Sequence, residues 1–410
     1  MLTWMQHQML DHRQRQSKSY TFEISKPDPV TRSSRAAICG PIAANIAFVL
    51  ELTLVPLLLP AIRSQFGLSI SDLAWVFNSY GVAVALGVLV GGWCGDVFNT
   101  RKVFNCGVAF FAAGSLVAAA ATSFETLIIG RILQGFGGGV FSPLVPLLLT
   151  RASPRKPGRI LILWGSIAGY VAAFAPLIFG SFLNGYSWNV AFIFIAIIAA
   201  IALLILIGSQ VVDDPAPSSR QKTDYSEIFR APDLWLTFVY VFCTYGSITY
   251  FLFRLPVWLS GNEVDTTSIG LVLSTVWLTF SALSALLRNM VDRHHIQTIM
   301  LAAPVLIATG LLLSYEDQNL PVLIISSVLV GAGLACSNAP STQLILKFAP
   351  DGMSAVSTSL DITFARLGGI ATVAIFAQTE GAYSGLAMCV LCLLAAVCAR
   401  KISKQFANGF

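Results

Sequence analysis

The chain has 410 residues, of which 56 % are hydrophobic and 11 % are charged, with a net charge of +5. A soluble protein carries about 25 % charged residues, so this composition excludes an ordinary soluble domain. The charges stand in short islands between apolar stretches of roughly 20 residues, the length that crosses about 30 Å of hydrocarbon. We therefore expect an integral membrane protein whose spans are helical, because lipid offers no partner to unpaired backbone groups.

Residues 1–35 are polar and charged and contain no apolar core, so they predict a cytoplasmic tail and not a signal peptide. Twelve apolar segments follow, and each predicts one transmembrane helix of an all-α integral membrane fold. Their expected ranges are 36–62, 72–93, 103–122, 124–150, 159–183, 189–210, 233–259, 267–289, 297–314, 320–347, 354–378 and 381–400.

The basic residues alternate between the two sides of these spans. Of the 25 lysines and arginines, all but four lie in the tails or at span ends and loops on the side of the tails. Arg63 lies on the opposite side, and Arg131, Arg254 and Arg366 lie within spans. Because basic loops stay in the cytoplasm, we expect both termini to be cytoplasmic and the protein to be multi-pass in the cytoplasmic (inner) membrane. The positive charge is thus a topology signal, and no nucleic-acid partner is expected.

The longest internal loop, VVDDPAPSSRQKTDYSEIFRAPD at 211–233, separates the sixth span from the seventh. Its proline, serine and charged residues are typical of a linker between two compact units. The predicted domains are the N-terminal tail, an N-terminal six-helix bundle (36–210), a cytoplasmic linker (211–232), a C-terminal six-helix bundle (233–402) and a cytoplasmic C-terminal tail (403–410).

A weak internal repeat supports this division. GGWCGDVFNTRK (91–102) follows the second span, and LLRNMVDRHHIQ (286–297) follows the second span of the second half. Each segment places an aspartate just past a predicted helix end, with basic residues nearby. Two pseudo-symmetric six-helix bundles predict a transporter whose site lies between them near the middle of the membrane.

GGWCGDVFNTRK also resembles the loop motif G-x-L-a-D-r-x-G-r-k of the major facilitator superfamily. Val97 replaces a basic residue and Asn99 replaces a glycine, and we expect Asn99 to keep the tight turn because asparagine tolerates left-handed backbone angles. In the family this loop is a conformational latch. The resemblance assigns that role to Gly92, Asp96 and Arg101, and to Asp292 and Arg293 in the second half.

Further segments resemble the drug:proton antiporter branch of that superfamily. LIIGRILQGFGGG (127–139) matches its fourth-helix motif, in which the arginine is associated with proton coupling, through Arg131, Gln134 and Gly135. LELTLVPLLLP (50–60) places Glu51 where the first-helix pattern has aspartate, and Pro56 where it has asparagine. SLDITFARLGGIATVAIFA (359–377) resembles a further segment of the branch, whereas GSIAGYVAAFAPLIFGSF (165–182) matches the fifth-helix antiporter pattern only in part. The resemblance implies the major facilitator fold from about residue 36 onward.

Five ionisable residues lie well inside predicted spans, where charges generally mark a transport pathway or a structural ion pair. Glu51 lies roughly 16 Å and Arg131 roughly 10 Å from the outer ends of their helices, so their side chains can meet. We predict proton coupling by Glu51, Arg131 and Asp361, with structural pairing or substrate binding as the alternative for Glu51. Substrate contacts are predicted for Arg254, Arg366, Glu51 and Gln134, with snorkelling to the interface as the alternative for Arg254.

Three embedded arginines against two acids favour a substrate with a carboxylate or phosphate group. The leading interpretation is a monomeric, proton-coupled secondary transporter that exports a small organic molecule by alternating access. Its substrate would be an anionic or zwitterionic metabolite, siderophore or drug. The proton gradient would drive it without a cofactor, and its partners would be the substrate, protons and lipid. The alternative is a proton-symport uptake carrier for a small organic anion.

Other classes of protein are less well supported. His294–His295 and the pair Cys389 and Cys392 complete no metal site, and no phosphate-binding glycine loop is present. We therefore expect neither an enzyme nor an ATP-driven pump, and a purely structural or receptor role stays open.

Overall fold

The computed structural model describes residues 35–407 except 155, 184, 209–225, 292–295, 317–318, 351–352 and 380–381. Every regular element in this part of the chain is helical. Twelve helical stretches are long and apolar enough to cross a membrane, and their bounds agree with the predicted spans to within a few residues. The predicted tail before Arg35, most of the predicted linker, and the end of the predicted C-terminal tail lie outside the described residues.

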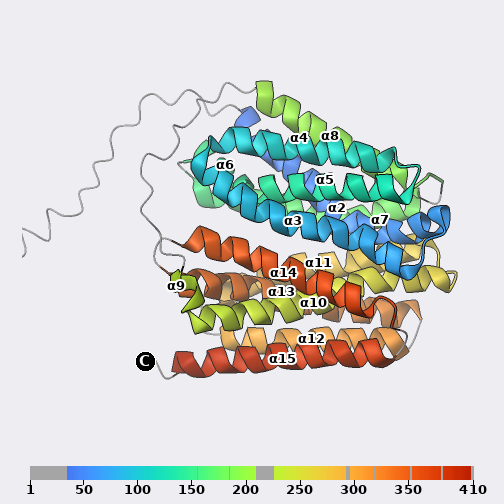
Figure 1. Cartoon of the computed structure of the whole chain (residues 1–410). Coiled ribbons are helices and arrows are strands. Elements are labelled where there is room, and N and C mark those ends of the chain that lie inside the picture. Colours follow the sequence, from blue (N-terminus) through green and yellow to red (C-terminus); the bar gives the residue numbers. More distant parts are fainter. Residues whose placement is uncertain are drawn as a thin grey trace, which may run out of the picture.

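The helices of the N-terminal half form the upper group in Figure 1, coloured blue to green. They are α2 (Arg35–Phe66), α3 (Ile70–Val97), α4 (Thr100–Ala119), α5 (Phe124–Phe141), the 3₁₀ helix η1 (Ser142–Leu144), α6 (Val145–Ala152), α7 (Pro157–Phe182) and α8 (Asn189–Gly208).

The helices of the C-terminal half form the lower group, coloured yellow-green to red. They are the short α9 (Ser226–Phe229), then α10 (Pro232–Gly261), α11 (Thr266–Val291), α12 (Ile296–Glu316), α13 (Leu320–Phe348), α14 (Ser354–Phe376) and α15 (Ala382–Ala407). We call the side on which α2 begins and α15 ends the terminal side, and the opposite side the far side.

The fourth span differs from the single helix expected over 124–150. The α-helix ends at Phe141, a 3₁₀ turn follows, and α6 continues to Ala152. Pro143 and Pro146 lie in the first turns of η1 and α6 and bring no backbone N–H to the helical ladder. By contrast, α2 runs without interruption through Pro56, where the sequence departs from the family pattern.

The turn after α3 also differs from expectation. Asn99 has φ −59° and ψ 115°, so it is not left-handed, and its side-chain oxygen accepts a hydrogen bond from the Lys102 N–H at the start of α4. Asparagine serves here as a helix N-cap. Asp96 lies inside the last turn of α3 rather than past its end. A comparable cap begins α11, where hydrogen bonds from Ser268 lower the pKa of Asp265 below its ordinary value.

Glycines bring the backbone of α5 into contact with both neighbouring helices. A methyl group on Gly130 would lie 2.6 Å from the Ala118 nitrogen of α4, and one on Gly135 would lie 2.5 Å from the Tyr80 carbonyl oxygen of α3. Gly137 approaches the backbone of α4 equally closely at Phe111. Small residues permit such contacts between membrane helices. The glycines of LIIGRILQGFGGG therefore fix α3, α4 and α5 as one tightly packed group.

The two halves meet along two seams, α3 against α14 and α7 against α11, and α2 also contacts α10. In the first seam Asn78 Nδ2 donates to the Ile370 carbonyl oxygen at 3.2 Å. The rings of Phe77 and Phe253 meet edge to face, 5.8 Å apart, where α3 faces α10. In the second seam a methyl group on Gly180 would lie 2.8 Å from the Thr266 carbonyl oxygen, near the far side.

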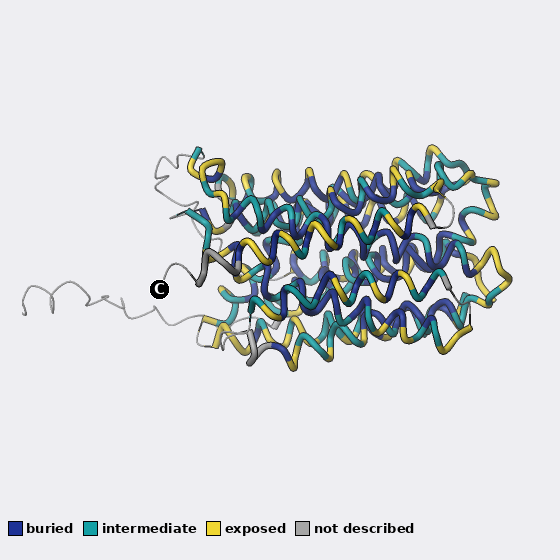
Figure 2. Tube along the Cα trace, turned by 90° about the horizontal axis from the view of Figure 1, so that it is seen from below, coloured by how far each residue is buried: buried dark blue, intermediate teal, exposed yellow. Residues whose placement is uncertain are grey.

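Figure 2 shows buried residues concentrated between the helices and exposed residues on their outward faces and at their ends. Large apolar side chains are exposed on these outward faces, including Leu204, Ile207, Ile178 and Leu393. A soluble protein does not expose so much apolar surface. These faces fit contact with lipid.

The glycine contacts predict opposite outcomes for one substitution at two sites. Gly137→Ala places a methyl group against the Phe111 backbone and 2.6 Å from the Gly107 carbonyl oxygen. We expect the free energy of unfolding to fall by about 1–3 kcal/mol. Gly165→Ala in α7 meets nothing within 4 Å, so its melting temperature should equal or exceed that of the wild type. Thermal unfolding of the purified variants in detergent tests this difference. Equal melting temperatures would contradict the close packing of α5.

Candidate functional site

Arg131 and Glu51 form a buried ion pair inside the N-terminal half. Arg131 Nη1 lies 2.6 Å from Glu51 Oε1, and the two side chains are only 1 % and 2 % exposed. α5 supplies the arginine and α2 supplies the glutamate, so the pair joins two helices that the sequence separates by 80 residues. The depth estimate from the sequence predicted this approach. A buried arginine of this kind needs both a counter-charge and hydrogen bonds to offset its desolvation.

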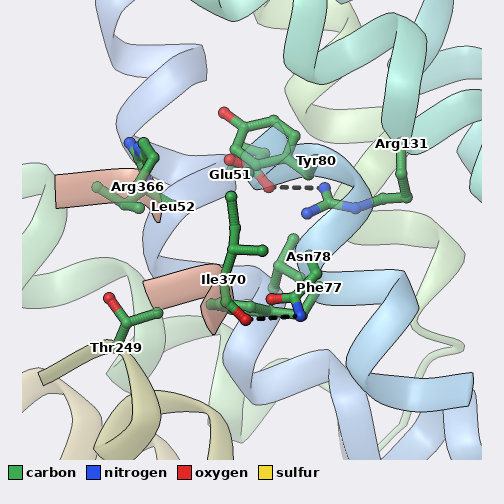
Figure 3. Close-up of a pocket in the computed structure, with 11 residues that line it drawn as sticks. Glu51, Leu52, Phe77, Asn78, Tyr80, Arg131, Thr249, Arg366 and Ile370 are labelled. Atoms are coloured by element: carbon green, nitrogen blue, oxygen red, sulfur yellow. Dashed lines mark hydrogen bonds and ion pairs between the residues drawn. The ribbon is translucent and has the colours of Figure 1, made fainter. Parts of the chain in front are cut away.

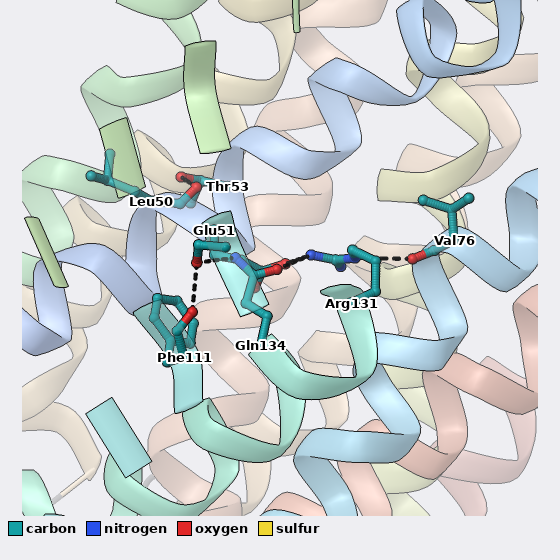
Figure 4. A network of polar contacts seen from close by, with 8 residues as sticks. Leu50, Glu51, Thr53, Val76, Phe111, Arg131 and Gln134 are labelled. Carbon is teal, nitrogen blue, oxygen red and sulfur yellow. Dashed lines mark hydrogen bonds and ion pairs between the residues drawn. The ribbon is translucent and has the colours of Figure 1, made fainter. Parts of the chain in front are cut away.

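Those further hydrogen bonds come from a network around Arg131 (Figure 4). Its Nε donates to the Val76 carbonyl oxygen at 3.1 Å, and its Nη1 also donates to Gln134 Oε1 at 2.7 Å. Gln134 Nε2 in turn donates to Ser115 Oγ at 2.9 Å, and Ser115 Oγ donates to the Phe111 carbonyl oxygen at 2.7 Å. The network therefore holds the guanidinium in one orientation from α3, α4 and α5.

Gln134 takes part in the hydrogen-bond network around Arg131. It is fully buried and lies within the hydrogen-bond network, and it is not among the residues that line the pocket described next. Its contacts orient Arg131, and the substrate contact predicted from the sequence stays a prediction.

A pocket lies directly beside the ion pair, between the two halves (Figure 3). Its space between atoms is about 400 Å³ when open solvent is counted, but the room for water-sized molecules is only about 30 Å³, so the pocket is narrow in this conformation. The lining comes from α2, α3 and α5 of one half and from α10 and α14 of the other. Its residues are Glu51, Leu52, Val55, Phe77, Asn78, Tyr80, Gly81, Arg131, Thr249, Arg366 and Ile370.

Arg366 is the charged residue that the C-terminal half contributes to this pocket. Among the residues that the structure describes, it has no ion pair or hydrogen bond. Arg131 differs, since it is already paired with Glu51. With Glu51 ionised, the two arginines leave the pocket with one surplus positive charge.

Arg254 lies apart from the pocket, between aromatic side chains of the C-terminal half. Its guanidinium carbon is 3.6 Å from the centroid of the Tyr315 ring and 5.0 Å from that of Trp258. Cation–π contacts of this kind stabilise an arginine without an acidic partner. The geometry does not bring Arg254 together with Glu51, Arg131 and Arg366.

Asp361 is also separate from the pocket lining. It lies on α14 five residues before Arg366, so the two side chains leave the helix on different faces. Asp361 is half-buried, and no hydrogen bond or ion pair to it occurs within the described part of the chain. Its predicted coupling role stays a prediction.

The loop motif is only partly described. Arg101 Nη2 donates to the Leu206 carbonyl oxygen at the end of α8, a contact within the N-terminal half. Gly92 faces α14, where a methyl group would lie 3.4 Å from Ser359 Oγ. The Asp96 side chain and residues Asp292 and Arg293 lie outside the described residues. The latch role therefore stays a prediction.

Sequence reasoning missed the polar pocket residues Asn78, Tyr80 and Thr249. Asn78, Ser79 and Tyr80 form the triplet NSY inside the apolar segment VFNSYGVAV, and adjacent polar side chains in a span could have signalled a lined cavity. The Tyr80 ring lies 4.3 Å from the guanidinium carbon of Arg131, so it also covers one face of the ion pair.

The family model described as Major Facilitator Superfamily matches residues 42–373. The "Multidrug resistance protein B homolog" of Mycobacterium tuberculosis is 29 % identical over 193 residues, which cover 46 % of this chain and 35 % of the relative. The "Tetracenomycin C resistance and export protein" of Streptomyces glaucescens is 27 % identical over 237 residues, which cover 57 % of this chain and 41 % of the relative. The matches thus span well under half the length of these relatives.

Solved structures agree on the fold. The crystal structure of a D-xylose-proton symporter superposes with a TM-score of 0.73 and 16 % sequence identity, covering 90 % of this chain and 96 % of the symporter. At this identity the likeness shows the arrangement of the helices alone.

The ion pair predicts non-additive effects on stability. Arg131→Met alone leaves the Glu51 carboxylate buried without its partner, and we expect a loss of about 3–5 kcal/mol. Arg131→Met combined with Glu51→Leu removes both charges, and the double variant should lose less stability than the sum of the losses in the two single variants. Thermal unfolding of the wild type, the two single variants and the double variant in detergent measures this coupling. Additive losses would show that the two residues do not stabilise each other.

Proposed function

The chain belongs to the Major Facilitator Superfamily, and from this we propose that it exports a small organic molecule in exchange for protons by alternating access. As a member of this family it is a multi-pass transporter with twelve candidate spans. The observation that carries the proposal is the Glu51–Arg131 ion pair, which forms the wall of a pocket between the two halves. A carboxylate at that position can exchange a proton while the pocket is open to one side.

The printed names of the relatives support export. Both relatives are named for resistance, and one also for export. In the proposed cycle, substrate binds from the cytoplasm while Glu51 is ionised. After the halves reopen to the other side, protonation of Glu51 favours release. Asp361 is a second place at which this proton could bind.

The charges of the pocket favour a substrate with an acidic group. Arg366 has no acidic partner among the described residues, and a guanidinium recognises carboxylate and phosphate groups by paired hydrogen bonds. The same surplus charge is the specific observation in favour of a second function, proton-coupled uptake of a small organic anion. Protonation of Glu51 removes a nearby negative charge and would assist the binding of an anion.

We further propose that the protein lies in the cytoplasmic membrane with both termini in the cytoplasm. The distribution of lysine and arginine supports this orientation, since only Arg63, in the last turn of α2, lies at the far-side end of a span. The proposed rigid units are the two six-helix halves, joined by the linker.

Glu51→Gln should abolish proton-driven transport, because the amide keeps the shape of the side chain but does not carry a proton reversibly. Substrates are first found by comparing metabolites in medium from cells that produce the wild-type and Glu51→Gln proteins. Export predicts that adding such a compound to everted vesicles collapses an acid interior in the wild type. The dye acridine orange reports this change.

Asp361→Asn is the matched control, because it neutralises the other embedded carboxylate. Full coupling in Asp361→Asn and none in Glu51→Gln assigns the proton to Glu51. Unchanged coupling in Glu51→Gln would refute the assignment. Proton entry with substrate into right-side-out vesicles would indicate uptake in place of export.

A further inference from the structure

The wall of the pocket formed by the N-terminal half carries hydrogen-bond acceptors that lack a donor. Glu51 Oε1 accepts from Arg131, but Glu51 Oε2 is buried with no hydrogen-bond partner in the described part of the chain. Asn78 shows the same asymmetry, since its Nδ2 donates to Ile370 while its Oδ1 has no partner among these residues. Buried polar atoms are rarely left unpaired, so each such atom calls for a ligand or a water molecule.

One neighbouring group adds to this acceptor wall, and another lies against it. The Tyr80 hydroxyl is buried beside the Glu51 carboxylate, without a hydrogen bond of good geometry among the described residues. Pro56 has no N–H, so the carbonyl of Leu52, which would be its acceptor in the helix, receives no intrahelical hydrogen bond from that position. Leu52 and Tyr80 both line the pocket. A ligand group with several N–H or O–H donors would satisfy this wall.

The opposite wall, formed by the C-terminal half, carries the Arg366 guanidinium. It provides up to five N–H donors and no acceptor. Leu52, Val55, Phe77 and Ile370 line the space between the two walls. The pocket is therefore polar at two ends, with an acceptor wall on one half, a cationic wall on the other, and apolar contacts between them.

From this polarity we infer that the transported substrate is an amphipathic zwitterion that bridges the halves, with its ammonium group on Glu51 Oε2 and its acidic group on Arg366. The inference rests on the proposed function and names the substrate class of the same pocket. A simple anion would leave the acceptors of the Glu51 wall unpaired. A simple cation would leave Arg366 unpaired.

The bridge also decides the sign of the coupling between substrate and proton. An ammonium group and a proton compete for Glu51, so protonation weakens the binding of the zwitterion, as exchange requires. An anion that binds only Arg366 gains from protonation of Glu51, because a nearby negative charge disappears. By reciprocal linkage, the first ligand favours exchange and the second favours symport. One site thus accounts for both functions considered above.

The ionisable groups that face Glu51 through the pocket are few. Arg131 approaches from α5, Tyr80 from α3 and Arg366 from α14, and α10 contributes the non-titrating Thr249. α8 carries no ionisable side chain. The remaining helices that pack on α2 are α6, α7, α10 and α11. Their ionisable side chains outside the pocket lining are Arg151, Arg159, Tyr170, Asp233, Tyr240, Cys243, Tyr245, Tyr250, Arg254 and Arg288.

Three fluorescent probes with a common body test the inference. Nε-dansyl-lysine is a zwitterion, dansylcadaverine lacks its carboxylate, and 6-(dansylamino)hexanoic acid lacks its amine. Binding to the purified full-length protein in detergent is measured by fluorescence at about pH 5 and pH 7, where the amines stay charged and the carboxylates stay mostly ionised. No gradient is present, so the result does not depend on whether transport is proton-driven.

We expect the zwitterion to bind at least about 10-fold more tightly than either probe with a single charge at pH 7, the gain from one further charge-assisted hydrogen bond. Its affinity should fall from pH 7 to pH 5, whereas that of the anion should rise. The inference would be overturned if the cation bound most tightly, if the affinities for zwitterion and anion changed equally with pH, or if no probe bound. Proton-driven transport by the wild type alongside such a result would leave the proposed function standing.

Two variants separate the walls of the pocket. Arg366→Gln should weaken the binding of the zwitterion about 10-fold or more and leave the binding of the cation nearly unchanged. The affinity of this variant for the zwitterion should still fall from pH 7 to pH 5. Glu51→Gln should remove the pH slope and keep the preference for the carboxylate. Arg400→Gln, an exposed charge near the end of α15, is the matched control and should behave as the wild type. An equal loss of affinity for the zwitterion and the cation in Arg366→Gln would contradict the proposed bridge.

Discussion

The dehydration of charge inside a membrane is the constraint on which this structure depends. Arg131 is stable where it lies because Glu51 neutralises it and because the Val76 carbonyl and Gln134 accept two further hydrogen bonds from it. Each of these partners comes from a particular helix, so the arginine requires α2, α3 and α5 to meet at one depth. The glycines of α5 allow that meeting, since larger residues would separate the backbones. Charge and packing therefore impose the same arrangement.

The arrangement separates two kinds of embedded charge. Arg131 and Glu51 satisfy each other within one half, whereas Arg366 enters the pocket from the other half with no described partner. Arg254 is stabilised by aromatic rings at a distance from the pocket. Of the three embedded arginines, one is structural as well as functional in the proposal, one faces the pocket, and one packs among side chains of its own half.

The sequence was sufficient to predict the twelve spans, because each span is a continuous apolar stretch that only a helix can satisfy in lipid. It also predicted the approach of Glu51 to Arg131, because depth in the membrane follows from distance to a helix end. It did not predict the 3₁₀ turn after Phe141 or the capping role of Asn99, which depend on local hydrogen bonds. Nor could it distinguish Arg366 from Arg254, since the direction in which a helix faces its neighbours is set by tertiary packing.

The close backbone contacts of α5 have a consequence for any motion between the halves. Because α3, α4 and α5 leave no room to slide past one another, these three helices should move together in the proposed cycle, and the ion pair ties α2 to them through Glu51. Arg366 belongs to the other half, so its distance from Glu51 would change in the proposed alternation between the halves. The electrostatic environment of the buried carboxylate then becomes a function of the separation between the two bundles. The charge around Glu51 would then depend on the position of the other half, with no rearrangement of the contacts among α3, α4 and α5.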